Sequence, residues 1–184
     1  MTQLASRARR SILGIGATFL AAPMLAVAPK SRASGGARTL SFENLHTGEA
    51  LSLVYAAGDR YVTAALASVR HFLRDFRNAE THVIDPALLD QLHALAAATG
   101  TRAPYQVISG YRSPATNERL RREGHGVATA SLHLTGQAID IRLADVALAD
   151  LRDAALALRA GGVGYYPQPD SNFVHIDTGR VRRW

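Results

Sequence analysis

The chain has 184 residues, of which 47% are hydrophobic and 20% charged, so it is long enough for one globular domain, too short for two, and unlike a disordered protein. Its net charge of +6 is concentrated at the start: residues 1–33 hold five of the 21 basic residues and none of the 15 acidic ones, which leaves 16 basic against 15 acidic residues beyond them. That balance excludes the basic surplus expected of a nucleic-acid-binding protein, and the absence of cysteine excludes disulfides, thiolate metal sites and an acylated lipoprotein anchor.

The first 33 residues are expected to be an export signal. Arg9 and Arg10 precede a long apolar run, and the glycine and proline residues within that run disfavour a membrane-spanning helix. Paired arginines in this position are typical of a twin-arginine signal; an ordinary secretory signal that holds two adjacent arginines is the alternative. Small residues predict cleavage after Ala28 or after Ala33. We therefore expect a periplasmic protein that meets the membrane only during export.

The remainder of the chain mixes strand and helix patterns with short links. Proline directly after a capping residue predicts helix starts at Asp85 and Ser113, and Gly100 and Gly161 predict helix ends. The predicted strands cover residues 39–44, 50–55, 105–109, 137–143, 162–166 and 172–177, and the predicted helices cover 61–77, 85–100, 113–123 and 146–160. We expect one α+β domain over residues 34–184, in which helices flank a small antiparallel sheet.

Side-chain alternation separates the polar residues of two predicted strands from their aliphatic ones. The strand over 137–143 presents Asp140 on the face opposite its isoleucines. The strand over 172–177 presents His175 and Asp177 on the face opposite its valine and isoleucine. If the two strands pair, Asp140 and His175 come together, with Asp177 beside them.

His133 lies just before the first of these strands, and Gly136 allows the chain to turn so that the imidazole can reach the same point. Two imidazoles and one carboxylate, with a fourth position left to water, are typical of a catalytic zinc site. The spacing alone leaves an alternative open, in which the histidines are structural and Asp140 forms an ion pair with Arg112 or Arg142.

Several motifs around these residues resemble a known family. Residues 131–140 read Ser-x-His-x-x-Gly-x-Ala-x-Asp and residues 109–114 read Ser-Gly-Tyr-Arg-Ser-Pro. Both resemble the D-alanyl-D-alanine metallopeptidase (LAS) family, which contains carboxypeptidases and endopeptidases that cut the bacterial cell wall. Four further segments resemble its murein endopeptidase K branch: residues 44–49, 73–77, 161–167 and 173–179.

This resemblance implies roles for individual residues. His133, Asp140 and His175 would bind one zinc ion that acidifies water and polarises the scissile carbonyl. Arg112 would neutralise the oxyanion or hold a substrate carbonyl, which suits a fixed guanidinium. Asn117, which with Thr116 follows the 109–114 motif as is usual in the family, and Ser131, which opens the 131–140 motif, are expected to contact substrate.

One position departs from the pattern, because many relatives have an acid three residues before the last metal ligand and this chain has Asn172. Asp177 is the expected replacement as general base, and its alternative role is to orient a histidine ligand. Asp170, in the loop before the strand, is the reserve candidate for the base.

The resemblance implies a periplasmic zinc metallopeptidase that hydrolyses amide bonds involving D-amino acids in peptidoglycan crosslinks, with an endopeptidase favoured over a carboxypeptidase. The expected partner is the peptide crosslink, with no nucleic acid and no obligate protein partner. One alternative is a non-catalytic, zinc-containing wall-binding module of the same fold, which the missing acid at Asn172 favours. Another is a cytoplasmic hydrolase of small D-Ala-D-Ala dipeptides, which the export signal disfavours.

Overall fold

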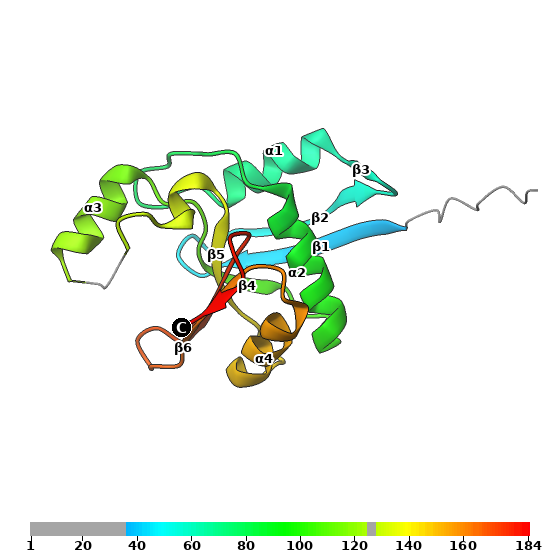
Figure 1. Cartoon of the computed structure of the whole chain (residues 1–184). Helices are drawn as coiled ribbons and strands as arrows, with labels where there is room; N and C mark the ends of the chain where they lie inside the picture. The colour runs from blue at the N-terminus through cyan, green and yellow to red at the C-terminus, as the bar shows by residue number, and fades with distance from the viewer. Residues whose placement is uncertain (1–35, 125–127) are drawn as a thin grey trace, which may run out of the picture. The chain divides into compact units, whose positions relative to one another are not determined.

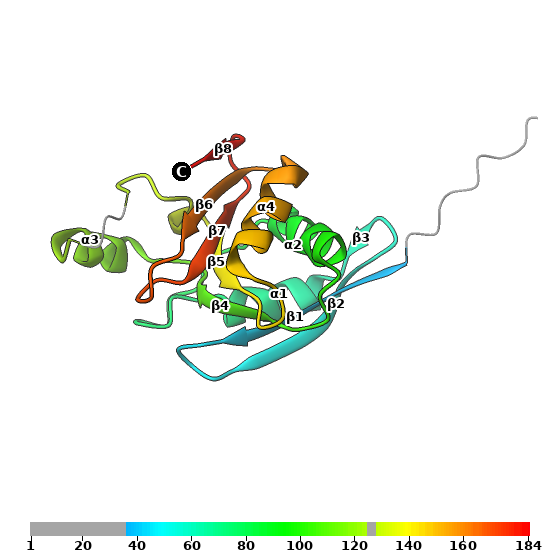
Figure 2. The ribbon, with the colours of Figure 1, turned by 90° about the horizontal axis from the view of Figure 1, so that it is seen from below.

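The computed structural model describes residues 36–124 and 128–184 (Figures 1 and 2), so the predicted export signal lies outside the described residues. The strands are β1 (Ala37–Asn44), β2 (Ala50–Ala57), β3 (Arg60–Tyr61), β4 (Tyr105–Ser109), β5 (Ala138–Arg142), β6 (Gly162–Tyr166), β7 (Phe173–Asp177) and β8 (Arg182–Arg183). The helices are α1 (Thr63–Phe72), α2 (Pro86–Thr99), α3 (Pro114–Arg122) and α4 (Leu148–Leu158), with a short 3-10 helix, η1 (Leu132–Thr135). None of these helices is long and apolar enough to span a membrane. The α+β class is confirmed.

The sheet differs from the small antiparallel sheet expected from the sequence. The eight strands of the described residues form one sheet in the order β3-β2-β1-β4-β5-β7-β6-β8. The pairs β1–β4 and β6–β8 are parallel, whereas the other five pairs, those of β3-β2-β1 and of β4-β5-β7-β6, are antiparallel, so the sheet is mixed. The chain leaves β1, forms β2, β3, α1 and α2, and re-enters beside β1 in the same direction, which is the long crossover that parallel pairing requires.

Helices cover one face of the sheet. Helix α1 packs against β2, α2 against β1, and α4 against β6 and β7, while α2 and α4 lie side by side (green and orange in Figures 1 and 2). The core between these layers contains Phe42, Leu92, Ile139 and Ile176, each at most 5% exposed. Burying aliphatic and aromatic surface here provides the main stabilisation of the fold and leaves the second face of β5 and β7 free to carry polar side chains.

Most predicted elements are confirmed within a few residues. The predicted caps are also present: the Asp85 side chain accepts a hydrogen bond from the Ala87 amide, and Gly100 ends α2 with a left-handed φ of 68°. The helix predicted over 61–77 is wrong at its end, because α1 stops at Phe72. Beyond it, the amide of Asp75 bonds to the carbonyl of Glu80 at 2.9 Å instead of continuing the helix.

Candidate metal centre

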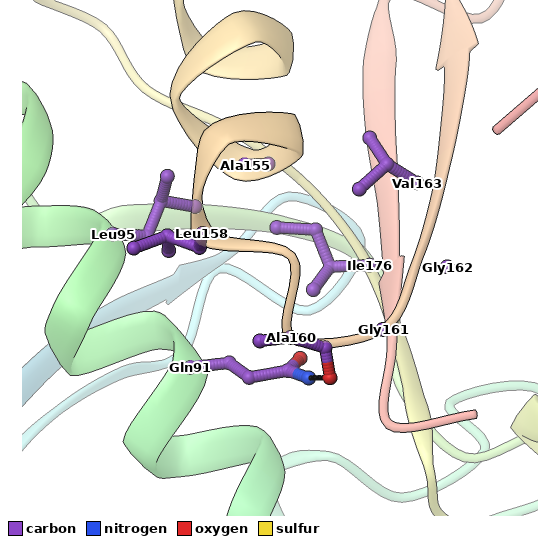
Figure 3. Close-up of a pocket in the computed structure, with 9 residues that line it drawn as sticks. All are labelled: Gln91, Leu95, Ala155, Leu158, Ala160, Gly161, Gly162, Val163 and Ile176. Carbon is purple, nitrogen blue, oxygen red and sulfur yellow. Dashed lines mark hydrogen bonds between the residues drawn. The ribbon is translucent and has the colours of Figure 1, made fainter. Parts of the chain in front are cut away.

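The register of the central strands places Asp140 of β5 directly opposite His175 of β7, and Ala138 opposite Asp177. This is the pairing expected from alternation in the sequence. The same strands turn Ile176 toward α2 and α4, where Figure 3 shows it with Val163 and Leu95. The polar residues therefore share the face of the sheet that points away from these helices.

His133 reaches the cluster from η1. The carbonyl of Gly136 accepts a hydrogen bond from the Asp85 amide at 3.0 Å, and its φ of 67° lets the chain turn directly from η1 into β5. The Nδ1–H of His133 donates to the carbonyl oxygen of Gly110 at 2.6 Å. That bond fixes the tautomer and directs Nε2 toward Asp140 and His175.

Three potential ligand atoms form a small triangle. His133 Nε2 lies 3.2 Å from Asp140 Oδ1 and 3.2 Å from His175 Nδ1, and the latter two atoms are 2.9 Å apart. Tetrahedral zinc with bonds of about 2.0–2.2 Å separates its ligand atoms by roughly 3.3–3.6 Å. The three side chains are buried. Among the described residues, they form the group whose ligand atoms lie close enough together to hold a metal ion. The donor set therefore fits one zinc ion with little adjustment.

Asp177 faces the other side of the His175 ring. Its Oδ2 accepts from His175 Nε2 at 3.1 Å, so Nδ1 of His175 is left without a proton in the neutral ring. The carboxylate also accepts from both terminal nitrogens of Arg182, at 2.7 and 3.1 Å, and from the amides of Gly162 and Gly179. This geometry favours the role of orienting His175 over the role of general base.

The charges of the cluster follow from these contacts. Burial acts to raise the pKa of Asp140, but the neighbouring His133 and His175 hold it well below its usual range. Burial acts to lower the pKa of His175, but hydrogen bonds to Asp140 and Asp177 raise it to about 9. Burial likewise opposes ionisation of Asp177, whose pKa is nevertheless lowered by bonds from His175 and Arg182. Both carboxylates are thus anionic at neutral pH, and a cation bound here would displace a proton from His175.

Arg112 lies beside the triangle. It is 9% exposed, its backbone amide donates to the carbonyl of His133 at 3.1 Å, and one terminal nitrogen is 3.8 Å from Asp140 Oδ2. Its Nε is buried and has no hydrogen-bond partner among the residues that the structure describes. A buried donor without a partner is uncommon, and here it leaves a guanidinium with free hydrogen-bonding capacity next to the cluster.

The other predicted site residues contribute no atom to the triangle. Asn117 is buried on α3, where its Nδ2 donates to the carbonyl of Ala128, and none of residues 36–124 and 128–184 donates to its Oδ1. Ser131 is half-buried directly before η1. Asp170 is exposed in the turn between β6 and β7. Asn172 has a φ of 47°, a left-handed conformation that Asn tolerates better than most residues, which gives it a backbone role.

The hollow shown in Figure 3 is separate from the cluster and lies on the helical side of the sheet. Gln91 of α2 reaches across it and donates to the carbonyls of Ala160 and Asp177, at 2.6 and 3.3 Å. The apolar space has a volume of about 10 Å³, which is room for one water molecule at most. It is a packing gap, and Gln91 ties the end of β7 to α2.

Sequence reasoning missed two residues around His175. Arg182 binds Asp177, and the indole of Trp184 lies 5.2 Å from the His175 ring, centroid to centroid. The strand that carries Arg182 is only two residues long and has no periodicity to find. The sequence signal for such neighbours is the alternation Gly162-x-Gly164, which leaves the first two positions on one face of β6 without side chains.

Comparison with known proteins gives consistent results. A family model described as "Peptidoglycan L,D-endopeptidase MepK" matches residues 32–184. The peptidoglycan L,D-endopeptidase MepK of Escherichia coli (strain K12) is 47% identical over 177 residues, which cover 96% of each chain. A probable peptidoglycan L,D-endopeptidase MepK of Haemophilus influenzae is 43% identical over 148 residues, covering 80% of this chain and 78% of the relative.

Among solved structures, the L-Ala D-Glu endopeptidase ChiX of Serratia marcescens covers 52% of this chain and 80% of its own. It matches with a TM-score of 0.37 and 19% sequence identity.

Proposed function

The chain belongs to the peptidoglycan L,D-endopeptidase family of the MepK type, and on that premise we propose that it is a periplasmic, zinc-dependent endopeptidase that opens peptide crosslinks of the wall. The bond cut would be an amide between an L-configured and a D-configured centre, as the names of its relatives state for them. The single observation that carries this proposal is the buried triangle of His133 Nε2, Asp140 Oδ1 and His175 Nδ1.

These three atoms would hold the zinc ion. When bound, zinc supplies a Lewis acid for the scissile carbonyl and lowers the pKa of water to near neutrality. The protein prepares the ligands: the Gly110 carbonyl fixes the tautomer of His133, and Asp177 fixes that of His175. Such outer partners orient the ligands and raise their basicity.

Arg112 would bind the substrate carbonyl at the position where negative charge develops. Its guanidinium is held near Asp140, and its buried Nε bonds to no other described residue, so a substrate oxygen can take that hydrogen bond. A fixed donor in a site with little water stabilises a developing oxyanion more strongly than a mobile one. Ser131 and Asn117, whose Oδ1 has no partner within the described part of the chain, would line the approach of the peptide.

Export would precede this activity. The predicted signal at residues 1–33 would take the chain across the inner membrane. Arg9 and Arg10 favour the twin-arginine route, and cleavage would follow near Ala28 or Ala33. The proposed substrate lies on the far side of that membrane.

Metal analysis tests the proposal. We expect one zinc per chain in the purified protein and little or none in His133→Ala, Asp140→Ala and His175→Ala, because a three-ligand site rarely survives the loss of one ligand. His71→Ala is the matched control, since His71 is exposed on α1. Stoichiometric zinc in the His175→Ala protein would remove that residue from the ligand set.

A further inference from the structure

The strand next to β7 lacks side chains at the positions that face the cluster. Gly164 of β6 pairs with His175, and the Gly162 amide donates to Asp177 Oδ1 at 3.1 Å. A Cβ atom at Gly164 would lie 2.7–2.9 Å from three atoms of the Trp184 indole. A Cβ atom at Gly162 would collide with the Arg182 guanidinium. The glycines therefore create space that two side chains of the C-terminal segment fill.

The C-terminal segment is held in register beside β6. Strand β8 pairs in parallel with it, the amide of Tyr165 donates to the carbonyl of Trp184 at 3.1 Å, and the amide of Trp184 donates to the carbonyl of Val163 at 3.3 Å. The indole Nε1–H donates to the Tyr166 hydroxyl at 2.6 Å. The Arg182 guanidinium lies over the same indole, 4.7 Å from the ring centroid. Backbone and side-chain contacts together define one position for the ring.

His175 is consequently held from two directions. Asp177, fixed by Arg182, bonds to the edge of the imidazole at Nε2. The indole of Trp184 packs against the ring at 5.2 Å with an interplanar angle of 51°. An edge contact alone leaves an imidazole free to tilt about that hydrogen bond, whereas a second contact on the ring limits the tilt. The aim of Nδ1 toward Asp140 and His133 depends on both.

We propose that Trp184, seated over Gly164, is a positioning residue for His175, and that docking of residues 182–184 and zinc binding stabilise each other. This inference rests on the proposed function, because it requires His175 to be a zinc ligand. The coupling is reciprocal: a docked tail prepares the ligand, and a bound metal holds the ring against which the tail packs. The C-terminal residues are then part of the metal centre and not only an edge strand.

Two variants disturb the indole in different ways. Trp184→Ala removes it, and Gly164→Ala leaves it in the chain but occupies its space. Both should weaken zinc binding, measured by competition with a chromophoric chelator, by roughly 10-fold to 100-fold, the usual effect of losing a partner that orients a ligand. Trp184→Phe keeps an aromatic ring and should retain most of the affinity. Val181→Ala, at an exposed residue of the same segment, is the matched control and should bind zinc like the parent.

Spectroscopy gives a readout that a purely structural role would not change. With Co²⁺ in place of zinc, the visible absorption of the Trp184→Ala and Gly164→Ala proteins should differ from that of the parent, because ligand geometry sets those bands. Trp184 is the single tryptophan of the chain, so fluorescence reports on it alone. Saturating zinc should reduce acrylamide quenching of that fluorescence in the parent. Because this measurement uses the parent alone, it does not depend on whether the variants fold.

Several results would overturn the inference. Zinc affinities of the Trp184→Ala and Gly164→Ala proteins equal to that of the parent would do so, as would acrylamide quenching that saturating zinc leaves unchanged. Failure of the proposed zinc site gives a different result, because the parent itself would then bind no stoichiometric zinc. That result would overturn both the proposed function and the positioning role of Trp184. Loss of zinc in the Val181→Ala control would also contradict the inference, because the effect would not be specific to the indole.

Discussion

The carboxylate of Asp177 accepts hydrogen bonds from five donors of the described residues: His175, two nitrogens of Arg182, and the amides of Gly162 and Gly179. A carboxylate has about four lone-pair sites, so its capacity is used. Its side chain is fully buried and bonds to the nitrogen of His175 that points away from Asp140. A general base needs a lone pair aimed at the reacting water, and Asp177 does not offer one in this geometry.

Asp177→Asn separates the two roles. If Asp177 orients His175, the variant should bind zinc roughly 10-fold to 100-fold more weakly, and activity should recover when zinc is raised. A general base would instead show normal zinc content with turnover reduced roughly 100-fold to 10,000-fold. Measuring zinc affinity and turnover at saturating zinc decides between them. A large loss of turnover in the fully loaded variant would reinstate Asp177 as the base.

Arg112→Lys tests the substrate-facing guanidinium. Lysine keeps the positive charge near Asp140 but loses the planar fork and the buried Nε donor, which bonds to none of the described residues. We expect the variant to bind zinc like the parent, with turnover lowered roughly 100-fold to 1,000-fold, the usual effect of removing one oxyanion donor. Arg142→Lys, a change at a residue of β5 whose side chain bonds to Gln106, is the control and should leave turnover unchanged. Turnover of Arg112→Lys equal to that of the parent would contradict the assigned role.

At the scale of elements, alternation in the sequence was sufficient to bring Asp140, His175 and Asp177 to one face of β5 and β7. That inference needs only the strand period and the pairing of two strands. The end of α1 was not predictable in the same way, because Asp75 leaves the helix to bond with Ser113, 38 residues away. The parallel pairs and strand β8 also depend on partners distant in the sequence, and a two-residue strand carries no pattern of its own.

Asp75 links the segment after α1 to the start of α3, directly beyond Arg112. It is 1% exposed, and its Oδ2 accepts from the amide and hydroxyl of Ser113 at 3.0 and 2.8 Å. Ser113 in turn caps α3 by accepting from the Thr116 amide at 3.2 Å. Burial acts to raise the pKa of Asp75, but its hydrogen bonds to Thr116, Ser113 and Arg77 lower it below its usual value.

Asp75→Asn should lower the free energy of unfolding by about 1–3 kcal/mol at pH 7, because the bonds to an ionised acceptor are lost. The pKa of Asp75 is lower in the folded chain than in the unfolded chain, where it is about 4. The ionised carboxylate therefore makes its full contribution to the free energy of unfolding above about pH 4, and that contribution is lost as the pH falls through the folded-state pKa. The difference in free energy of unfolding between parent and variant should therefore decrease below pH 4, as measured by urea unfolding with a chelator present. Asp59→Asn, at an exposed residue, is the control. A gap that stays constant from pH 7 to pH 2.5 would contradict this assignment.

At the scale of the whole chain, the surplus of positive charge belongs to residues 1–33, and the remainder is close to neutral. Replacing Arg9 and Arg10 with lysine keeps that charge but removes the paired arginines. If export uses the twin-arginine route, the double variant should accumulate as precursor inside the cell, seen by fractionation and immunoblotting. Normal export of the variant, blocked instead by inhibiting the general secretory pathway, would assign the signal to that pathway.

We propose that His133, Asp140 and His175 hold a zinc ion with which the protein cuts peptide crosslinks of the wall. The most direct test is the muropeptide profile of whole sacculi after incubation with the purified protein, alone, with a chelator, and with zinc restored. We predict that crosslinked muropeptides decrease, that the chelator stops this and zinc restores it, and that the Asp140→Ala protein leaves the profile unchanged. Crosslink cleavage that continues in the chelator would contradict this proposal, as would a zinc-loaded protein that binds to sacculi and leaves their muropeptide profile unchanged.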